Sequence, residues 1–470
     1  MASSESRKML TVKAAFDGSD IGALPCHDVA AAEEALVTAY ELFRDRRMWL
    51  SASVRIEILR RTGEIMRDRI EELTLQASRE GGKPYADSKI ELRRAIDGVE
   101  NCIEVLRAEA GEVIPMGISK PSAGRVAFTR REPIGVVVAV SAFNHPMNLI
   151  VHQVAPGVAA GCPVIVKPAP DTPLSGKAFV EILHEAGLPP EWCQLIVTDE
   201  IDVAEKLVTD ERVGLFSFIG SARVGWMLRS KLAPGTRAAL EHGGVAPVIV
   251  AADANLDDAV PRIVKGGFYH AGQVCVSVQR VFAHADIARK LAERISEQAG
   301  ALIVGDPTAP ETEVGPLIRP GEVTRVGEWV KEATDGGGES LTGAKPISET
   351  CYAPTVLYDP PANSRVSNNE IFGPVVCVYP YDALEDALAR ANGLPYAFQA
   401  AIFTRDIETA MEAYSGLDAS AVMVNDHTAF RVDWMPFAGL RQSGLGVGGI
   451  PHTFDEMTIN KMMVLRSDRL

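Results

Sequence analysis

Residues 134–140, IGVVVAV, begin the part of the chain that decides the fold. A helical pattern follows this uninterrupted apolar run, and the same alternation repeats after residues 163–167 (PVIVK) and residues 213–220 (VGLFSFIG). Short apolar runs that are bounded by Gly or Pro and separated by helices are typical of βαβ units with buried parallel strands. The sequence therefore predicts an α/β fold whose ligand-binding loops lie at the carboxyl ends of parallel strands.

Helical patterns precede this region, and a second α/β block follows it. Apolar residues recur at three- and four-residue spacing over residues 51–81 and 88–110, which predicts that the first hundred residues are helical. The polar, β-leaning residues 124–131 predict a strand outside the main core. Further along, a helix over residues 256–272 and a strand over residues 278–282 are expected in the second block.

Length and charge limit the classes of protein. The chain has 470 residues, of which 47% are hydrophobic, and its formal net charge is −15. A chain of this length is expected to form about three domains around a large core. The acidic balance argues against nucleic acid or an anionic membrane as a partner, because both require a basic surface.

Cysteine content and apolar runs indicate the compartment. The seven cysteines are odd in number and none forms a C-x-x-C pair, which favours reduced thiols over a disulfide framework or a zinc site. The first twelve residues have no apolar signal-peptide core, and the longest apolar runs are far shorter than the ~20 residues that a bilayer requires. We expect a cytoplasmic protein without a metal centre.

Two glycine-rich segments are candidate phosphate sites, and the sequence favours one of them. Residues 444–449 (GLGVGG) match G-x-G-x-x-G, but they follow no clear strand and run into Ile450 and Pro451 instead of a helix, which predicts a turn. Residues 218–225 (FIGSARVG) follow an apolar strand and open a helix, so that backbone N–H groups and the helix dipole would meet an anion. An ordinary strand-to-helix turn is the alternative interpretation.

Cys275 differs from the other six cysteines in the residues that accompany it. It follows Gly and Gln in GQVCVS, and Glu241 lies upstream beside two glycines in LEHGG. A carboxylate among apolar strands is costly unless it is used. Asn144 follows the first core strand, where a loop would face a ligand. A buried structural cysteine is the alternative.

Together these segments resemble the aldehyde dehydrogenase superfamily. Seven motifs stand in the family's order and spacing over essentially the whole chain: FNHP (143–146), VKPAPDTP (166–173), FIGSARVG (218–225), LEHGG (240–244), GQVCVS (272–277), EIFGPVV (370–376) and PFAGLRQSGLG (436–446). The resemblance implies the aldehyde dehydrogenase fold. Its parts would be a Rossmann-like cofactor domain (1–116 and 134–243), an α/β catalytic domain (244–454) and a small β arm for oligomerisation (117–133 and 455–470). A homodimer or homotetramer is implied.

The resemblance also implies a role for each matching residue. Cys275 would be the nucleophile and Glu241 the general base, while Asn144 and the backbone N–H of Cys275 would form the oxyanion hole. The cofactor would be NAD, with NADP possible. Lys167 would hold the adenosine ribose, the turn after residue 219 the diphosphate, and Glu370 the nicotinamide ribose. The full set of implied cofactor residues is Ser141, Ala142, Phe143, Lys167, Pro170, Gly220, Ser221, Val224, Gly225, Glu370 and Phe372.

Three positions depart from the family pattern. Pro170 stands where a Glu often repels a 2′-phosphate, so NADP stays open as a cofactor. His242 replaces the usual Leu after the base, and the sequence indicates no role for it. Gln153 replaces a Lys that is thought to help move protons in many relatives.

Polar and charged residues replace apolar ones in the implied substrate pocket. These residues are Arg94, His145, His152 and Arg431. Arginine binds phosphonate, sulfonate or carboxylate oxygens through paired, charge-assisted hydrogen bonds, so the substrate is expected to be a small anionic aldehyde. For Arg94 alone, ordinary surface charge is an equal alternative.

We therefore predict an NAD(P)-dependent aldehyde dehydrogenase that forms a free acid through a cysteine thioester. Phosphonoacetaldehyde is the leading candidate substrate, because AFNHP and ALEHGG most resemble dehydrogenases of that aldehyde. Sulfonated aldehydes, succinate semialdehyde and glyceraldehyde 3-phosphate are the alternatives. A CoA-acylating enzyme is disfavoured because such relatives generally lack the base at Glu241. A non-catalytic protein on the same fold would have no reason to keep Asn144, Glu241, Cys275 and Glu370, and a thiol hydrolase would need a His–Asn pattern that does not accompany Cys275.

Overall fold

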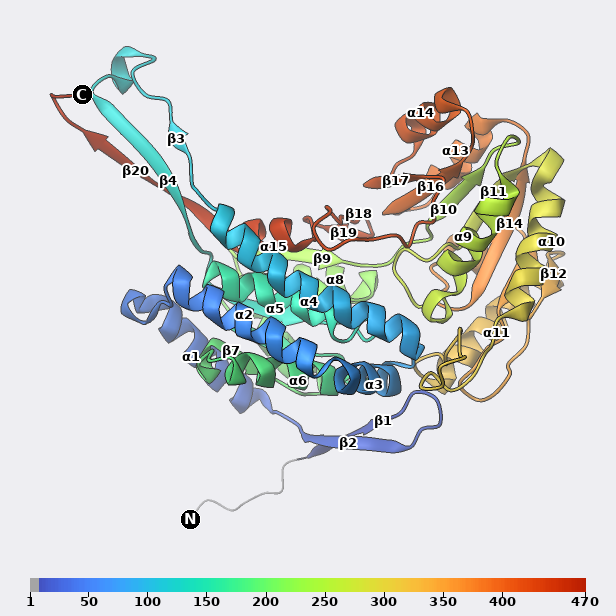
Figure 1. Ribbon diagram of the computed structural model, residues 1–470, viewed down its shortest axis with the longest axis horizontal. Coiled ribbons are helices and arrows are strands. Elements are labelled where there is room, and N and C mark those ends of the chain that lie inside the picture. Colours follow the sequence, from blue (N-terminus) through green and yellow to red (C-terminus); the bar gives the residue numbers. More distant parts are fainter. Residues whose placement is uncertain (1–7) are drawn as a thin grey trace.

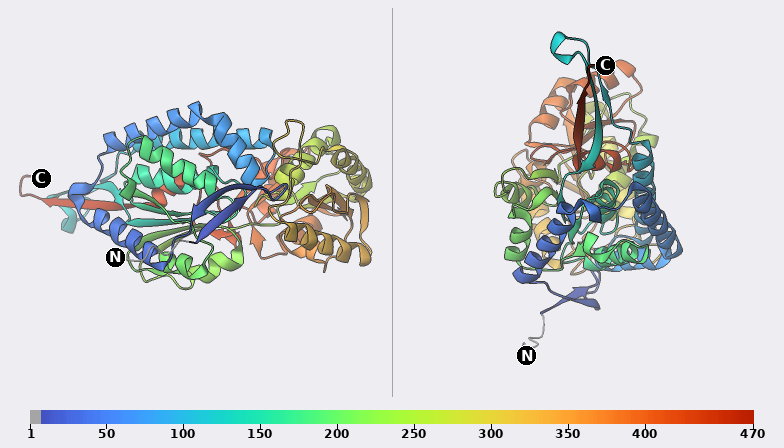
Figure 2. Two further views of the ribbon diagram at one scale, coloured as in Figure 1. Left: turned by 90° about the horizontal axis from the view of Figure 1, so that it is seen from below. Right: turned by 90° about the vertical axis from the view of Figure 1, so that its left-hand side faces the viewer.

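Two mainly parallel sheets form the two ends of an elongated molecule, and a long antiparallel arm projects beyond the first of them (Figures 1 and 2). The computed structural model describes residues 8–470. Residues 1–7, which belong to the predicted cofactor segment and to the N-terminal stretch considered for a signal peptide, lie outside the described part.

The first sheet is built from the apolar runs that open the βαβ region. Its strand order is β19-β9-β8-β5-β6-β7, in which β19 alone is antiparallel to its neighbour. The bounds are β5 Val136–Val140, β6 Val164–Lys167, β7 Cys193–Leu195, β8 Val213–Ile219, β9 Arg237–Glu241 and β19 Gly444–Leu445. The helices between them are α5 Asn148–Ala160, α6 Pro173–Glu185, α7 Ile201–Thr209 and α8 Ala222–Arg229. The prediction of βαβ units with a parallel sheet is confirmed.

Both faces of this sheet are covered by helices, which explains why its strands are apolar throughout. In β5, Val137 and Ala139 belong to one hydrophobic cluster, while Val136 and Val138 belong to another on the opposite face. The first cluster includes α5, α6 and the N-terminal helices α2 (Ala52–Asp68), α3 (Ile70–Gly81) and α4 (Tyr85–Ala108). The second includes α7 and the N-terminal helix α1 (Val29–Arg44). Alternate side chains of a strand point to opposite faces, so a strand covered on both faces is apolar at every position.

The N-terminal region is helical except for one hairpin that the sequence did not predict. Strands β1 (Met9–Lys13) and β2 (Asp20–Pro25) form an antiparallel pair ahead of the helices. Only Val12 and Leu24 of this hairpin are buried, so its apolar pattern is too weak to reveal a strand. The helices that follow are α1 Val29–Arg44, α2 Ala52–Asp68, α3 Ile70–Gly81 and α4 Tyr85–Ala108.

The second sheet has the strand order β12-β13-β14-β11-β10-β16-β17, with β12 antiparallel at one edge. Its strands are β10 Pro247–Val250, β11 Arg280–His284, β12 Glu339–Thr342, β13 Thr355–Tyr358, β14 Val375–Tyr381, β16 Gln399–Phe403 and β17 Ala421–Val424. Its helices are α9 Leu256–Phe268, α10 Ala285–Ala301, α11 Pro320–Asp335, α12 Arg365–Asn368, α13 Leu384–Asn392 and α14 Ile407–Gly416. One continuous hydrophobic cluster holds the sheet and its helices together.

The predicted helix over residues 256–272 is too long, and the following strand begins later than expected. Helix α9 ends at Phe268 because His270, Ala271 and Gly272 have positive φ angles of 49°, 54° and 72°. A left-handed backbone cannot continue a right-handed helix. The chain therefore leaves α9 in a left-handed turn and reaches β11 only at Arg280.

The arm consists of β3 (Val113–Ile114), β4 (Arg125–Pro133) and β20 (Thr458–Arg466). Strand β20 pairs with β4 along its whole length, so the C-terminus lies at the tip of the arm (Figure 1). The strand predicted over residues 124–131 is thus confirmed as β4. Phe128 is 40% exposed and Met462 is 53% exposed, so apolar side chains of the arm face outward.

Residues 444–449 were predicted to form a turn that follows no strand and precedes no helix, and the structure differs on both points. Gly444 and Leu445 form β19 against β9, and helix α15 (Ile450–Glu456) begins directly after the glycines. Proline is favoured in the first turn of a helix, so Pro451 opens α15 instead of preventing it. Two further short strands, β15 (Tyr396–Ala397) and β18 (Leu440–Arg441), pair with each other nearby.

Candidate active site

A cavity of about 800 Å³ lies between the carboxyl ends of the strands of the two sheets. It is lined by the loops after β5, β6, β8 and β9 and by the segment between α9 and β11. All predicted site residues line it except Gly225 and His152. The predicted catalytic, cofactor and substrate positions therefore share one space, although they come from distant parts of the chain.

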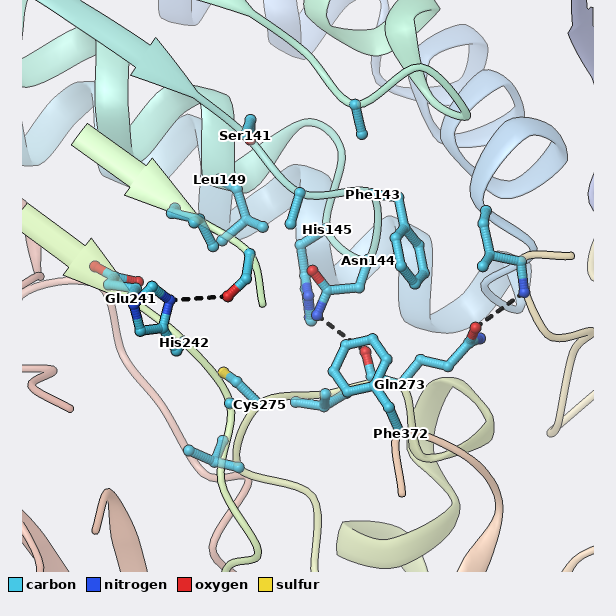
Figure 3. Close-up of a pocket in the computed structure, with 18 of the residues that line it drawn as sticks. Ser141, Phe143, Asn144, His145, Leu149, Glu241, His242, Gln273, Cys275 and Phe372 are labelled. Carbon is cyan, nitrogen blue, oxygen red and sulfur yellow. Dashed lines mark hydrogen bonds between the residues drawn. The ribbon is translucent and has the colours of Figure 1, made fainter. Parts of the chain in front are cut away.

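Cys275 lies in the segment that follows the left-handed turn after α9. Gln273 fixes this segment, because its side-chain Nε2 donates to the carbonyl of Pro316 (3.2 Å) and its Oε1 accepts from the N–H of Ile318 (2.9 Å). Figure 3 shows the side chain of Gln273 reaching from the cysteine loop to another segment of the same chain. The Gln that marked this motif in the sequence thus anchors the loop that carries the thiol.

Asn144 points from the loop after β5 toward the cysteine loop (Figure 3). Its Nδ2 donates one hydrogen bond to the carbonyl of Gln273 (2.9 Å), and its side chain is buried. An amide NH₂ has two N–H donors, so one stays available to an oxygen bound beside Cys275.

Glu91 fixes the same loop, a function that sequence reasoning missed. The N–H groups of Met147 and Asn148 both donate to its Oε1 at 3.0 Å, and Lys83 forms a fully buried ion pair with its other oxygen. A carboxylate at a helix N-terminus satisfies free N–H groups and complements the helix dipole. Glu91 therefore holds the start of α5, directly after Asn144.

Glu241 ends strand β9, and its carboxyl lies between two cavities. It lines the large cavity and also a small one of about 20 Å³ behind it, which is enough for one water molecule. Figure 3 shows the carboxyl turned away from the sulfur of Cys275. A Cβ at Gly448 would overlap this carboxyl, so glycine is required there. Burial raises the pKa of Glu241 and the charge of Arg431 opposes that rise, so this carboxyl group holds a proton more readily than an exposed one does.

The thiol of Cys275 is the accessible one. The other six cysteines are buried, whereas Cys275 is partly exposed to the cavity. Burial raises the pKa of Cys275 to about 12, and the nearby Arg431 charge opposes this rise. Because the thiolate is the nucleophile, the positive charge of Arg431 favours the reactive form.

The cofactor end of the cavity contains Lys167, Glu370 and Phe372. Burial lowers the pKa of Lys167 to about 8 and raises the pKa of Glu370 to about 8. Glu370 Oε1 is buried and has no hydrogen-bond partner within residues 8–470. A Cβ at Gly243 would overlap the Glu370 carboxyl, so this glycine makes room for it. An unpartnered buried carboxylate oxygen fits a ribose hydroxyl as its ligand.

Phe372 is held in a conformation that non-glycine residues rarely adopt. Its φ is 49°, and its ring meets the ring of Phe143 edge to face at 5.8 Å between centroids. Such a backbone is maintained only when surrounding contacts require it, and it is common at ligand sites. Phe143 comes from the loop after β5 and Phe372 from the loop before β14, and their rings meet at the wall of the cavity (Figure 3).

The turn between β8 and α8 contains Gly220 and Ser221. Ser221 is the N-cap of α8, and within the described chain its side chain makes no capping hydrogen bond. The hydroxyl and the first N–H groups of α8 are thus available to an anion. Gly225 does not line the cavity, contrary to its predicted role, because its Cα packs against the ring of His242.

The substrate end of the cavity is organised by Asp433, which sequence reasoning missed. Arg94 donates to both Asp433 oxygens, from Nε to Oδ2 at 3.1 Å and from Nη2 to Oδ1 at 2.7 Å. His152 Nε2 lies 2.7 Å from Oδ1. The sequence offered a signal, since Asp433 lies two residues after Arg431.

His152 does not line the large cavity, where the prediction placed it. It lines the small cavity, and its ring links Asp433 to Arg431, whose Nη2 lies 3.4 Å from His152 Nδ1. Arginine can only donate, so Nδ1 accepts and Nε2–H donates to the carboxylate. Burial lowers the pKa of His152 to about 4, so the ring is neutral.

Arg431 and His145 do line the large cavity. The guanidinium of Arg431 stacks 3.6 Å from the ring centroid of Phe437, which fixes its plane. His145 Nε2 lies 3.3 Å from the hydroxyl of Tyr269. Burial, with Lys83 and other nearby cations, lowers the pKa of His145 well below its usual range, so this ring is neutral.

When the general-base candidate Glu241 is set aside, the charges at the substrate end leave one net positive charge. Asp433 neutralises Arg94, the two histidines are neutral, and Asp87 pairs with Lys265 at 2.7 Å. Arg431 has no carboxylate within ion-pair distance among the residues that the structure describes. Glu241 lines the same cavity, and its charge favours the charged form of Arg431, but its carboxyl lies beyond ion-pair distance and also borders the small cavity.

Two kinds of site were not found in residues 8–470. No group of three or more His, Cys, Asp or Glu side chains is placed to hold a metal ion. None of the helices described here is long and apolar enough to cross a membrane.

The fold and the cavity define the class of the protein. Residues 1–463 match the aldehyde dehydrogenase family, and the chain belongs to that family. The protein is thus an oxidoreductase that acts on an aldehyde with NAD or NADP.

Known relatives are similar over nearly the whole chain. The 3-sulfolactaldehyde dehydrogenase of Priestia aryabhattai is 36% identical over 437 residues, which are 93% of this chain and 89% of the relative. Aldehyde dehydrogenase 21 of Physcomitrella patens, solved with the reaction product succinate, is 33% identical with a TM-score of 0.94, covering 99% of this chain and 96% of the other. Glyceraldehyde-3-phosphate dehydrogenase of Methanocaldococcus jannaschii, solved with NADP, is 32% identical with a TM-score of 0.93. The match covers 98% of this chain and 100% of the other.

Proposed function

We propose that this enzyme oxidises a small aldehyde with a singly charged anionic tail, a sulfonate or a carboxylate, to the free acid. The observation that carries the proposal is the charge at the substrate end of the cavity. Asp433 cancels the charge of Arg94, so Arg431 is the one net cation that faces a substrate tail. A buried charge is stable only when it is matched, and one cation matches one anion.

Phosphonoacetaldehyde, the candidate favoured by motif resemblance, fits this charge less well. A phosphonate approaches two negative charges at neutral pH, as a phosphate monoester does. The similarity to a sulfolactaldehyde dehydrogenase and to an enzyme solved with succinate supports a sulfonate or carboxylate tail. The similarity to a glyceraldehyde-3-phosphate dehydrogenase keeps a phosphorylated substrate as the alternative.

Cys275 would begin the reaction by attacking the aldehyde carbon. Its thiolate adds to the carbonyl, which forms a C–S bond and a tetrahedral oxyanion. The second N–H of the Asn144 amide and the backbone N–H of Cys275 would stabilise that oxyanion. Removing one such donor typically costs ~2.7–4 kcal/mol in the transition state.

The cofactor residues would hold the nicotinamide beside this intermediate. Lys167 and Glu370 would bind the two riboses, and the Gly220–Ser221 turn the diphosphate, because each presents free donors or acceptors to the cavity. When bound, the oxidised nicotinamide supplies a hydride acceptor. The tetrahedral intermediate loses a hydride and becomes a Cys275 thioester.

Glu241 would then activate water for hydrolysis. Its carboxylate takes a proton from water, the hydroxide attacks the thioester carbon, and the C–S bond breaks to release the acid. Pro170 supplies no charge against a 2′-phosphate, so both NAD and NADP are proposed as cofactors.

We also propose the domain division that the resemblance implied. Residues 1–116 and 134–243 would bind the cofactor, and residues 244–454 would form the catalytic domain. Residues 117–133 and 455–470 would form an oligomerisation arm in a homodimer or homotetramer. The outward-facing apolar side chains of the arm support this role.

A rate comparison tests the proposed substrate class. We would measure kcat/KM for sulfoacetaldehyde, succinate semialdehyde, phosphonoacetaldehyde and butanal, each with NAD and with NADP. The two singly charged aldehydes should exceed butanal by about 10-fold or more, since a hydrogen bond to a charged group contributes ~1.5–3 kcal/mol. A kcat/KM for butanal equal to those for the anionic aldehydes would refute an anionic substrate. A clearly higher kcat/KM for phosphonoacetaldehyde than for the other aldehydes would refute the preference for a singly charged tail.

A further inference from the structure

We propose that His242 is a positioning residue for the diphosphate of the cofactor. In this role it holds the Gly220–Ser221 turn against the end of strand β9, and so fixes that turn relative to Glu241. The inference rests on the proposed function in one respect only, namely that this turn receives the diphosphate.

Two successive residues hold both polar groups of Gly220. The N–H of Gly220 donates to the carbonyl of Glu241 at 3.1 Å, and His242 Nδ1 lies 3.0 Å from the carbonyl of Gly220 (Figure 3). A carbonyl can only accept, so His242 carries its proton on Nδ1 and donates it. His242, which follows the proposed general base Glu241, thus holds Gly220, which precedes the N-cap of α8.

The ring of His242 packs between aromatic side chains of strand β8 and helix α8. It lies between Phe218 and Trp226, with centroid distances of 5.6 Å and 5.7 Å and an interplanar angle of 64° to each. A Cβ at Gly225 would overlap the imidazole, so α8 can approach the ring only because this residue is glycine. Gly225 therefore serves the cofactor site indirectly, by admitting His242 beneath the helix.

The hydrogen bond to Gly220, and not the volume of the ring, explains why a histidine stands at this position. His242 is 2% exposed, and its Nε2 has no hydrogen-bond partner among residues 8–470. A buried polar atom without a partner destabilises the folded state, whereas a leucine at position 242 would fill the space without that cost. The hydrogen bond to Gly220 offsets the cost of burying the unpartnered Nε2 of the imidazole.

The clamp has a direct consequence for anion binding. With both groups of Gly220 held, the peptide between residues 220 and 221 cannot rotate, and the free N–H groups at the start of α8 keep one orientation. An anion site made of backbone N–H groups binds well only if those groups are preorganised. Loss of the clamp should therefore weaken cofactor binding more than it affects the aldehyde.

Three variants test this inference in the full-length enzyme. His242→Leu removes the donor, His242→Asn keeps a side-chain N–H at a similar distance, and Trp226→Leu disturbs the ring's packing without removing the donor. We would measure the Kd of NADH and NADPH by fluorescence titration, the KM of the aldehyde, and the rate of Cys275 alkylation by iodoacetamide without cofactor. His242→Met serves as a second donor-less variant if His242→Leu does not fold.

The donor-less variant should raise both cofactor Kd values by about 3- to 10-fold, as expected for one lost hydrogen bond. His242→Asn and Trp226→Leu should stay within about 2-fold of the wild type, and the aldehyde KM and the alkylation rate should not change in any variant. Unchanged Kd values in the donor-less variant, or equal losses in the Leu and Asn variants, would overturn the proposal.

A separate variant tests where the diphosphate lies. Ser221→Asp places a carboxylate at the N-cap of α8 and should weaken both cofactors by about 10-fold or more, through repulsion between like charges. If Ser221→Asp binds cofactor normally, the assignment of the diphosphate to this turn fails. A loss in Ser221→Asp together with normal binding in His242→Leu would leave that assignment intact and refute the clamp alone.

Discussion

Arg94 and Asp433 form a two-point ion pair across the substrate end of the cavity, although 339 positions separate them in the sequence. Planar guanidinium and carboxylate groups match each other in this arrangement, which is the strongest geometry for the pair. Asp433 neutralises the charge of Arg94 within the protein. Arg431 is thereby left as the cation that a substrate can use.

Replacing Arg431 should affect catalysis, whereas replacing Arg94 should mainly affect stability. Arg431→Gln should lower kcat/KM for an anionic aldehyde by roughly 10- to 150-fold, because a hydrogen bond to a charged group is lost. An uncharged aldehyde of equal length should lose less than about 3-fold. Arg94→Gln should mainly lower Tm, since it leaves the buried Asp433 without its main partner. Arg93→Gln, at an exposed site, is the control. A selective loss for the anionic aldehyde in Arg94→Gln but not in Arg431→Gln would reverse this assignment.

Asp433→Asn should change which charge the site prefers. With the carboxylate gone, Arg94 and Arg431 would both face the substrate, so the kcat/KM ratio of phosphonoacetaldehyde to sulfoacetaldehyde should rise by about 3-fold or more. Asp171→Asn, which removes the partner of Arg319 at the rim of the cavity, is the matched control and should leave the ratio unchanged. A ratio that stays constant in Asp433→Asn would show that net charge does not select the tail.

Asp433 also makes a specific contribution to acid stability. Burial raises its pKa, but the hydrogen bond from His152 and the charge of Arg94 outweigh burial and hold the pKa of Asp433 well below its usual range. A group with a lowered pKa stabilises the folded protein above its ordinary pKa, and this contribution is lost as the pH falls below about 4. Wild-type Tm should therefore fall more steeply below pH 4 than the Tm of Asp433→Asn. Parallel curves for the two proteins would exclude this contribution.

Cys275 should be the one thiol that reacts in the folded enzyme. Iodoacetamide should modify Cys275 alone, and Cys275→Ala should abolish oxidation, whereas Ala at each of the six buried cysteines should change kcat by no more than a few-fold. Arg431 opposes the rise in the pKa of Cys275, so Arg431→Gln should raise that pKa further and slow alkylation at pH 8. Faster alkylation in Arg431→Gln would contradict this sign.

Glu241→Gln should separate the two halves of the reaction. A first turnover of NADH should survive as a burst, while steady-state turnover falls by about 10²- to 10⁴-fold because no base activates the hydrolytic water. Stopped-flow absorbance of NADH measures both phases. Glu322→Gln, a carboxylate at the same cavity that pairs with Arg325, should keep both phases. A burst that disappears together with turnover would show that Glu241 is also needed to activate the thiol.

Pro170→Glu should make the enzyme select NAD. A carboxylate at this cavity position, close to Lys167, would repel a 2′-phosphate, so kcat/KM with NADP should fall by about 10-fold or more while the value with NAD changes little. Pro170→Gln, which has the same size without the charge, is the matched control. Equal losses with both cofactors would mean that residue 170 does not lie near the 2′-position.

The sequence by itself determined the elements and the reacting groups. Residues 134–140 and 213–220 are apolar at nearly every position because parallel strands are covered on both faces, and this pattern is local enough to read directly. The motifs around Asn144, Glu241 and Cys275 identified groups that the structure brings to one cavity. Where local pattern was weak, as in the exposed β1–β2 hairpin, the prediction was wrong.

Only the tertiary structure decided how charges and rings are paired. The ion pair of Arg94 with Asp433, the position of His152 behind the pocket and the contact of His242 with Gly225 each join residues whose spacing in the chain carries no signal. Such contacts depend on how whole helices and strands pack, since packing brings together side chains that no periodicity links. A local pattern can therefore predict which residue types occupy a site, while their protonation and net charge follow from neighbours that only the folded chain supplies.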